Sequence, residues 1–282
     1  MAAAPSLGHD GGLTILDPGR TALLNALDDL FAGWGREAGG EEVFPPPLFP
    51  VTELEKFDVY VNFPHLSLVA ASLRADGDME PREGRFEAGQ LQPAHLGLPT
   101  AACFGAYLFY EGRRVAPDTV VTLVNCCFRG EDHFNGLRRL LSFRMREIVA
   151  IGSYEHTQHI LHAHISRIEQ LCRFLSLDII TEAASDPFFQ REGARARLQT
   201  LQAVKHEFVV DGLAISSVNM HRNFFGERCN ITLGDDPADR FAYTSCVAFG
   251  LERWISVLLD RYGSAQAALA HVERASTEFQ PA

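Results

Sequence analysis

The sequence has few cysteines, no excess of basic residues and no long apolar run, and each absence excludes a class of protein. Its 25 Lys and Arg against 36 Asp and Glu give a formal net charge of −11, which argues against a broad basic surface for tRNA, DNA or an anionic membrane. No apolar stretch approaches the roughly 18 residues that a membrane-spanning helix needs. Six cysteines in 282 residues are too few for a disulfide scaffold, and no Cys-x-x-Cys pair marks a zinc knuckle or redox motif.

The beginning of the chain does not resemble a secretory signal. Residues 1–12 are small and glycine-containing, without a basic start or a long apolar run. We therefore expect a cytoplasmic protein with free thiols, a flexible N-terminus over 1–12 and a single domain over 13–282. The 46% hydrophobic and 22% charged residues are those of an ordinary globular protein.

Apolar periodicity predicts an α+β fold in which the strands are grouped rather than alternating with helices. The short connections between strands favour a mainly antiparallel sheet flanked by helices. Four prolines make residues 42–50 a loop or an edge strand, and polar residues make 75–92 an exposed loop. Helices are predicted over 13–34, 153–177, 192–202, from about 251 and again after 266; strands are predicted over 102–110, 120–129, 142–153, 205–210, 213–220, 228–233 and 243–250.

Three residues could bind a nucleotide at one predicted hairpin. Arg129 and Glu131 follow an apolar strand, and Phe143 stands near the start of the returning strand. A guanidinium suits phosphate, an aromatic face suits adenine, and a carboxylate can accept a hydrogen bond from the adenine amino group. Taken alone, an Arg-x-Glu pair is more often a surface ion pair.

A second candidate is Arg253, in the stretch FGLERW near the predicted start of a helix. Backbone N–H groups at a helix N-terminus attract phosphate, and an adjacent arginine strengthens such a site. On these residues alone, a plain strand-to-helix junction with Arg253 paired to an acid is an equal alternative.

Together these stretches resemble motifs 2 and 3 of the class II aminoacyl-tRNA synthetases, most closely the seryl branch. CFRGEDHFNGLRRLLSFRMRE has the Arg-x-Glu, loop and Phe of motif 2, and CVAFGLERW has the Gly and Arg of motif 3. EVFPPPLFP resembles motif 1, and AISSVN resembles a seryl-type strand. The resemblance spans about 13–263 and implies a class II catalytic domain over 13–282 without a tRNA-binding arm.

Truncated seryl-type homologues of this description are the amino acid:[carrier protein] ligases. The resemblance implies an active-site Zn²⁺ held by Cys103, Glu147 and Cys246, each on a predicted strand. Two thiolates and a carboxylate leave one zinc position for the amino group of the substrate. Spacing alone does not reveal this site.

The family resemblance also implies a two-step reaction. A small amino acid, glycine or alanine, would react with ATP to give an aminoacyl-adenylate and pyrophosphate; the thiol of a phosphopantetheinylated carrier protein would then take the aminoacyl group, releasing AMP. The assigned roles are Arg129 at the α-phosphate, Arg253 at the γ-phosphate, Phe143 against adenine, Glu131 near its amino group, and Ser217 and Asn219 at the amino acid.

Magnesium and partners complete these expectations. Glu207 is a candidate ligand for the Mg²⁺ that bridges the phosphates, with a plain surface Glu equally plausible, and Ala214 stands where the seryl-type pattern has a second acid. The family implies a homodimer, and we expect no tRNA and no membrane partner. An acidic carrier needs a local basic patch, for which the pairs 113–114 and 138–139 are candidates.

Other polar residues and other functions stay open. His156, His159, His162 and His164 suit a solvated or partly packed helix better than a metal site. Adjacent Cys126 and Cys127 point to opposite faces of a strand, and Cys172 belongs to a helix core. The alternatives are a seryl-type tRNA synthetase, an inactive binding paralogue, and a ligase with a small-molecule acceptor.

Overall fold

The computed structural model describes residues 6–77, 80–184, 205–234 and 240–279. A seven-stranded sheet forms the centre, in the order β10-β11-β12-β14-β9-β8-β3. All of its neighbours are antiparallel except β3 and β8, so the predicted mainly antiparallel sheet is confirmed. Its strands are β3 (Glu41–Val43), β8 (Asp118–Phe128), β9 (Ser142–Gly152), β10 (Ile179–Ala184), β11 (Lys205–Val210), β12 (Leu213–Arg222) and β14 (Tyr243–Gly250).

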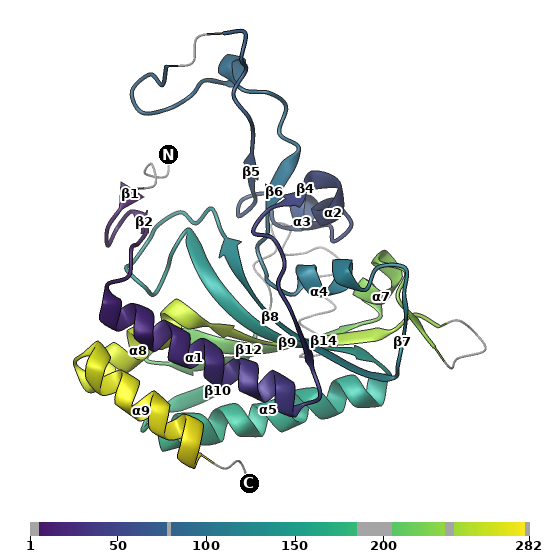
Figure 1. Cartoon of the computed structure of the whole chain (residues 1–282), viewed down its shortest axis with the longest axis vertical. Helices are drawn as coiled ribbons and strands as arrows, with labels where there is room; N and C mark the ends of the chain where they lie inside the picture. Colours follow the sequence, from purple (N-terminus) through teal and green to yellow (C-terminus); the bar gives the residue numbers. More distant parts are fainter. Residues whose placement is uncertain (1–5, 78–79, 185–204, 235–239, 280–282) are drawn as a thin grey trace.

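Long helices cover one face of this sheet (Figure 1): α1 (Pro18–Glu37), α5 (Tyr154–Phe174), α8 (Leu251–Tyr262) and α9 (Ala265–Glu278). Asp17 caps α1 by accepting the Arg20 N–H, and Pro18 starts the helix where no N–H is needed. Phe31 of α1 stacks on Phe249 of β14 with ring centroids 3.9 Å apart. The large apolar core therefore lies between these helices and the sheet. Among the described helices, none is long and apolar enough to cross a membrane.

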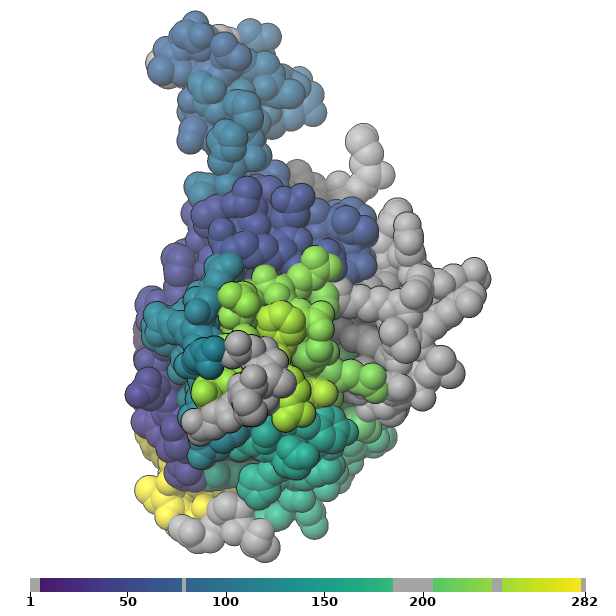
Figure 2. Space-filling model, turned by 90° about the vertical axis from the view of Figure 1, so that its right-hand side faces the viewer, coloured from purple at the N-terminus to yellow at the C-terminus, as the bar shows by residue number. Residues whose placement is uncertain are grey.

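Short elements cover the opposite face of the sheet and form a second apolar cluster there. They are α2 (Val51–Glu55), α3 (Val59–Asn62), α4 (Phe104–Phe109), α7 (Phe224–Arg228) and a small sheet of β4 (Phe49–Pro50), β6 (Leu96–Leu98) and β5 (Leu68–Ala70). The chain between β5 and β6 projects away from the body, which agrees with the exposed loop predicted over 75–92 (Figures 1 and 2). Two further small pairings join β1 (Ser6–Leu7) to β2 (Gly12–Leu13) and β7 (Arg114–Val115) to β13 (Thr232–Leu233).

Two strand predictions were wrong. The segment 102–110 forms the helix α4, because a short continuous apolar run is equally compatible with a buried helix. The segment 228–233 contains only the short strand β13, because its first residues end α7. Asn230 adopts a left-handed backbone (φ 50°), and the Ile231 N–H returns to Gly226 O at 2.8 Å, which is the Schellman ending of a helix. The helix predicted over 192–202 lies outside the described residues.

Candidate active site and metal centre

One pocket brings together the candidate nucleotide-binding residues, which are up to 124 positions apart (253 − 129) in the sequence. Arg129 and Glu131 come from the turn after β8, Phe143 from β9, and Arg253 from the first turn of α8. Their neighbours in the pocket wall are Leu137, Arg138, Arg139, Leu140, Gly250 and Glu252. The β8–β9 hairpin and the β14–α8 junction therefore form a single site.

Arg129 lies across the aromatic face of this pocket. Its Nε and Nη2 donate to Thr100 O at 3.2 and 3.1 Å, which places its guanidinium carbon 5.1 Å from the centroid of Phe143. Glu131 accepts from Arg139 Nη1 at 2.8 Å, so Glu131 does pair with an arginine, but with one in the pocket wall.

Arg253 is a half-buried cation, and within the described residues its hydrogen bonds go to no acid. Its Nε donates to Arg138 O at 3.1 Å and its Nη1 to Ala214 O at 2.9 Å, both neutral backbone carbonyls. Burial, together with the nearby charge of Arg129, lowers the pKa of Arg253 to about 10. Two guanidinium groups that repel each other in a pocket form an environment suited to an anion.

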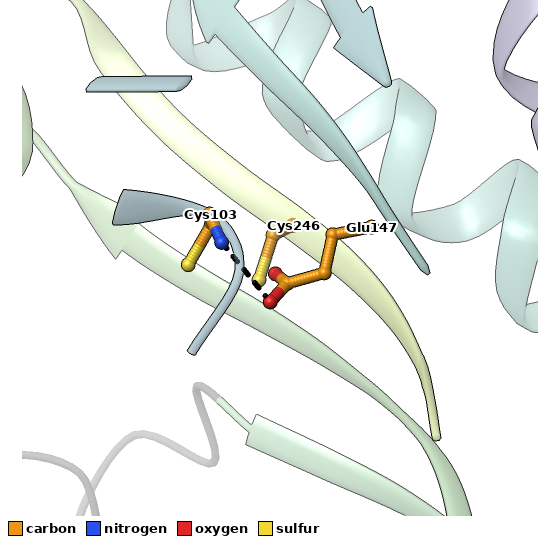
Figure 3. A group of neighbouring side chains, drawn as sticks. All are labelled: Cys103, Glu147 and Cys246. Atoms are coloured by element: carbon orange, nitrogen blue, oxygen red, sulfur yellow. Dashed lines mark hydrogen bonds between the residues drawn. The ribbon is translucent and has the colours of Figure 1, made fainter. Parts of the chain in front are cut away.

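The three candidate metal ligands also meet. The ligand atoms of Cys103, Glu147 and Cys246 lie within 4.8 Å of one another, and all three residues are buried (Figure 3). Glu147 and Cys246 extend from β9 and β14. Cys103 lies at the N-cap of α4, not on the predicted strand. Among the described residues, this is the one group of three or more His, Cys, Asp or Glu side chains with such spacing.

The bonding of this group fits a cation. Glu147 Oε1 accepts from the N–H groups of Ala102 and Cys103 at 2.9 and 3.1 Å, whereas Glu147 Oε2 is buried and has no hydrogen-bond partner among the described residues. Burial raises the pKa of Glu147, and the hydrogen bond with Cys246 together with burial raises that of Cys103 well above its usual value. Three such groups side by side disfavour ionisation unless a cation compensates them. Two thiols and a carboxylate are ligand types that zinc accepts.

One face of the sheet connects the pocket to the metal ligands. Glu207 pairs with Ser217 in the ladder, and Asn219 pairs with Cys246, so these side chains share a face. Asn219 Nδ2 lies 3.4 Å from Ser217 Oγ and 3.6 Å from Cys246 Sγ. Lys205 holds Glu207 Oε1 at 3.0 Å. The candidate substrate residues therefore lie between the two sites.

Sequence reasoning missed two residues beside the metal ligands. His221 Nε2 lies 3.7 Å from Cys246 Sγ, and His221 Nδ1 lies 3.2 Å from Tyr107 Oη. The alternation that places Ser217 and Asn219 on one face continues to position 221, and this signal could have found the histidine.

The helix histidines and the other candidate cysteines belong to neither the pocket nor the metal-type group. His164 packs into the core with Nδ1 2.8 Å from Ile160 O, and none of the four helix histidines joins a metal-type group within the described part of the chain. Cys172 is fully buried, as predicted. Cys127 is buried, whereas Cys126 on the other face is only half-buried.

Curated relatives resemble this chain over most of its length. No protein-family model matches the chain. It is 32% identical over 277 residues to amino acid–[acyl-carrier-protein] ligase 1 of Bradyrhizobium diazoefficiens, covering 92% of this chain and 82% of the relative. Ligase 2 of the same organism is 32% identical over 263 residues, covering 87% and 78%. A type-2 serine–tRNA ligase of Methanococcus aeolicus is 29% identical, and this chain covers 52% of its length.

Solved structures show the same fold. Seryl-tRNA synthetase of M. kandleri, in complex with A. aeolicus tRNASec, superposes with a TM-score of 0.74 at 19% identity. The match covers 95% of this chain and 57% of that synthetase. The Pyrococcus horikoshii enzyme complexed with ATP gives a TM-score of 0.64 at 16% identity, covering 92% and 57%. The chain thus has a class II seryl-tRNA synthetase fold and belongs to the amino acid–[acyl-carrier-protein] ligase family.

Proposed function

We propose that the protein activates a small amino acid with ATP and transfers it to the phosphopantetheine thiol of a carrier protein. The observation that carries this proposal is the placement of an arginine-lined pocket and a buried Cys–Glu–Cys group on one sheet face, joined by Ser217 and Asn219. With ATP in the arginine-lined pocket and the amino group of an amino acid at the Cys–Glu–Cys group, the carboxylate of that amino acid would lie towards the α-phosphate. Catalysis then rests mainly on positioning and charge stabilisation.

In the first step the carboxylate attacks the α-phosphorus, and pyrophosphate leaves. Arg129 neutralises the α-phosphate and Arg253 binds the γ-phosphate, which relieves the repulsion between the two guanidinium groups. Phe143 stacks on adenine, and Arg129 lies beside this position with its guanidinium carbon 5.1 Å from the ring centroid. Glu131 accepts from the adenine amino group, and Glu207 is the one acid we assign to Mg²⁺.

Cys103, Glu147 and Cys246 would hold Zn²⁺, which supplies a Lewis-acid position for the amino group of the substrate. The Ala102 and Cys103 N–H groups fix one oxygen of Glu147, and the other oxygen is the one that would bind the ion. Tyr107 and Phe225 stack 4.0 Å apart beside this group. That aromatic wall supports a substrate with little side chain, glycine or alanine.

In the second step the carrier thiol attacks the adenylate carbonyl, and AMP leaves. Arg138 and Arg139 line the nucleotide pocket, so the pair 113–114 is the better candidate for carrier docking. Arg113 is exposed and lies 4.4 Å over the Phe109 ring at the end of α4. We also propose a homodimer, as the class II fold implies, and a cytoplasmic location.

The test is amino acid-dependent exchange of pyrophosphate into ATP across the twenty amino acids, on protein whose zinc content has been measured. Exchange with glycine or alanine and about one zinc per chain is expected, followed by loading of a phosphopantetheinylated carrier. Exchange with serine, followed by charging of tRNA, would assign the seryl-type alternative. No exchange with any amino acid would favour a binding paralogue.

A further inference from the structure

Cys246 has a second group of polar neighbours beyond Cys103 and Glu147. His221 Nε2 lies 3.7 Å from its sulfur, and Asn219 Nδ2 lies 3.6 Å from it. Neither residue belongs to the group whose ligand atoms all lie within 4.8 Å of one another. His221 therefore contacts one side of the metal centre, from outside the set of ligands.

The contacts of His221 select its tautomer. A cysteine that binds metal is a thiolate, and a thiolate sulfur only accepts hydrogen bonds. The proton of the neutral imidazole must then be on Nε2, facing Cys246. Nδ1 is left as an acceptor, and the hydroxyl of Tyr107 lies 3.2 Å from it. Thr244 Oγ1 also lies 3.4 Å from Nδ1, but its hydroxyl donates to Arg222 O at 3.4 Å. Tyr107 is therefore the hydroxyl that donates to Nδ1.

The surroundings hold this chain of hydrogen bonds in place. Tyr107 is fully buried and stacks on Phe225, and the His221 ring meets Phe225 edge-on at 4.9 Å. The imidazole is thus fixed by an aromatic ring on one side and a hydroxyl on the other. Groups that orient metal ligands in this way change metal affinity by about 10–100-fold in other proteins.

We propose that His221 is a positioning residue of the metal centre: its Nε2–H donates to the thiolate of Cys246, and the hydroxyl of Tyr107 keeps the proton on that nitrogen. With Asn219, this gives Cys246 two N–H donors, which lower the charge on its sulfur and aim it at the ion. The inference rests on the metal centre of the proposed function.

The experiment compares His221→Asn with His221→Gln. The amide nitrogen of Gln reaches the position of Nε2, whereas that of Asn stops short of it. By competition with a chromophoric chelator, we expect His221→Asn to bind Zn²⁺ about 10–100-fold more weakly, and His221→Gln to recover most of the affinity. Tyr107→Phe should cause a smaller loss. His159→Asn, an exposed histidine on α5, is the matched control and should change nothing.

Cobalt substitution supplies a readout that a purely structural role would not move. Loss of an N–H donor raises the energy of the thiolate electrons, so the thiolate-to-Co²⁺ charge-transfer band should shift to longer wavelength in His221→Asn and not in His221→Gln. Circular dichroism of the metal-free variants shows whether they fold. If His221→Asn does not fold, the charge-transfer band of Tyr107→Phe is compared with that of the wild type instead.

The two proposals fail differently. A wild-type protein that binds no Zn²⁺ overturns the metal centre itself and this inference with it. A wild type that binds Zn²⁺, with unchanged affinity and band position in His221→Asn, overturns only the role of His221. If His221→Asn and His221→Gln both lose the tetrahedral Co²⁺ spectrum completely, the imidazole is itself a metal ligand. That result would also overturn the positioning role of His221.

Discussion

At the scale of single residues, the two sites have opposite electrostatic needs. In the candidate nucleotide pocket, burial and the nearby charge of Arg129 lower the pKa of Arg253 to about 10. In the candidate metal group, burial raises the pKa of Glu147, and the hydrogen bond with Cys246 together with burial raises that of Cys103. A bound anion would reduce the repulsion between the two arginines, and a bound cation would stabilise the ionised thiols and carboxylate.

Arg253→Met tests the pocket. The substitution keeps the apolar stem but removes the phosphate contact, so pyrophosphate exchange should fall by about 100-fold or more. Arg253 is half-buried, so its removal offsets a desolvation cost against the loss of two hydrogen bonds to backbone carbonyls, and the melting temperature should change by only a few degrees. Arg113→Met, on the exposed turn, should leave exchange unchanged. Near-normal exchange in Arg253→Met would remove the phosphate role.

Cys246→Ser tests the metal group. A serine hydroxyl is a poor zinc ligand, so zinc content by atomic emission and exchange activity should fall together. Cys126→Ser, on the half-buried side of β8, should retain both. Full zinc occupancy in Cys246→Ser would mean that the ligand set is wrong.

At the scale of elements, α5 carries a buried histidine that lies near α1. His164 Nδ1 is hydrogen-bonded to Ile160 O, and its buried Nε2 has no partner in the part of the chain that the structure describes. The ring packs near Trp34 of α1. Burial lowers its pKa from 6.5 to about 4, so it is neutral in the folded protein at neutral pH.

This histidine predicts acid sensitivity. Between pH 6.5 and about 4 the unfolded chain binds a proton that the folded chain does not, so stability falls as the pH falls through that range. The full effect is up to about 3 kcal/mol. Urea unfolding of wild type and His164→Gln at pH 7.5, 5.5 and 4.5 measures it. The variant should show a shallower loss, and equal slopes would rule out His164 as the source.

At the scale of the whole molecule, the sheet face that carries the candidate site and the projecting hairpin are separate features. The hairpin between β5 and β6 stands clear of the body (Figure 2), and Leu73 faces Leu91 across an antiparallel bridge near its base. The described site residues come from the central sheet and its connections, from the N-cap of α4 and from α8.

Replacing residues 75–89 by Asn-Gly should therefore be tolerated. A two-residue Asn-Gly turn is closed by a hydrogen-bonded pair, and the Arg74 N–H already donates to Gln90 O at 2.8 Å beside the Leu73–Leu91 bridge. We expect thermal denaturation to show a melting temperature within a few degrees of wild type, and zinc content and exchange to persist. A protein that no longer folds would show that the hairpin supports the body.

Much of the fold was predictable where local patterns are strong. The apolar period and Asp17–Pro18 cap placed α1, and long apolar runs placed β8, β9 and β14. The strand prediction for 102–110 was wrong because a short apolar run suits a buried helix equally well. His221 was missed because its importance comes from Cys246 and Tyr107, which are distant in sequence.

The sequence by itself determined the residue types: arginines with an aromatic ring that suit a nucleotide and, through the family resemblance, two thiols with a carboxylate that suit a metal. It also determined the strands that carry most of them, through periodicity. Only the tertiary structure decided that Cys103, Glu147 and Cys246 meet, that Arg253 bonds to carbonyls rather than to an acid, and that His221 lies against Cys246. The reason is that ladder register and the packing of α4 on the sheet set these distances, and both depend on contacts between residues far apart in the chain.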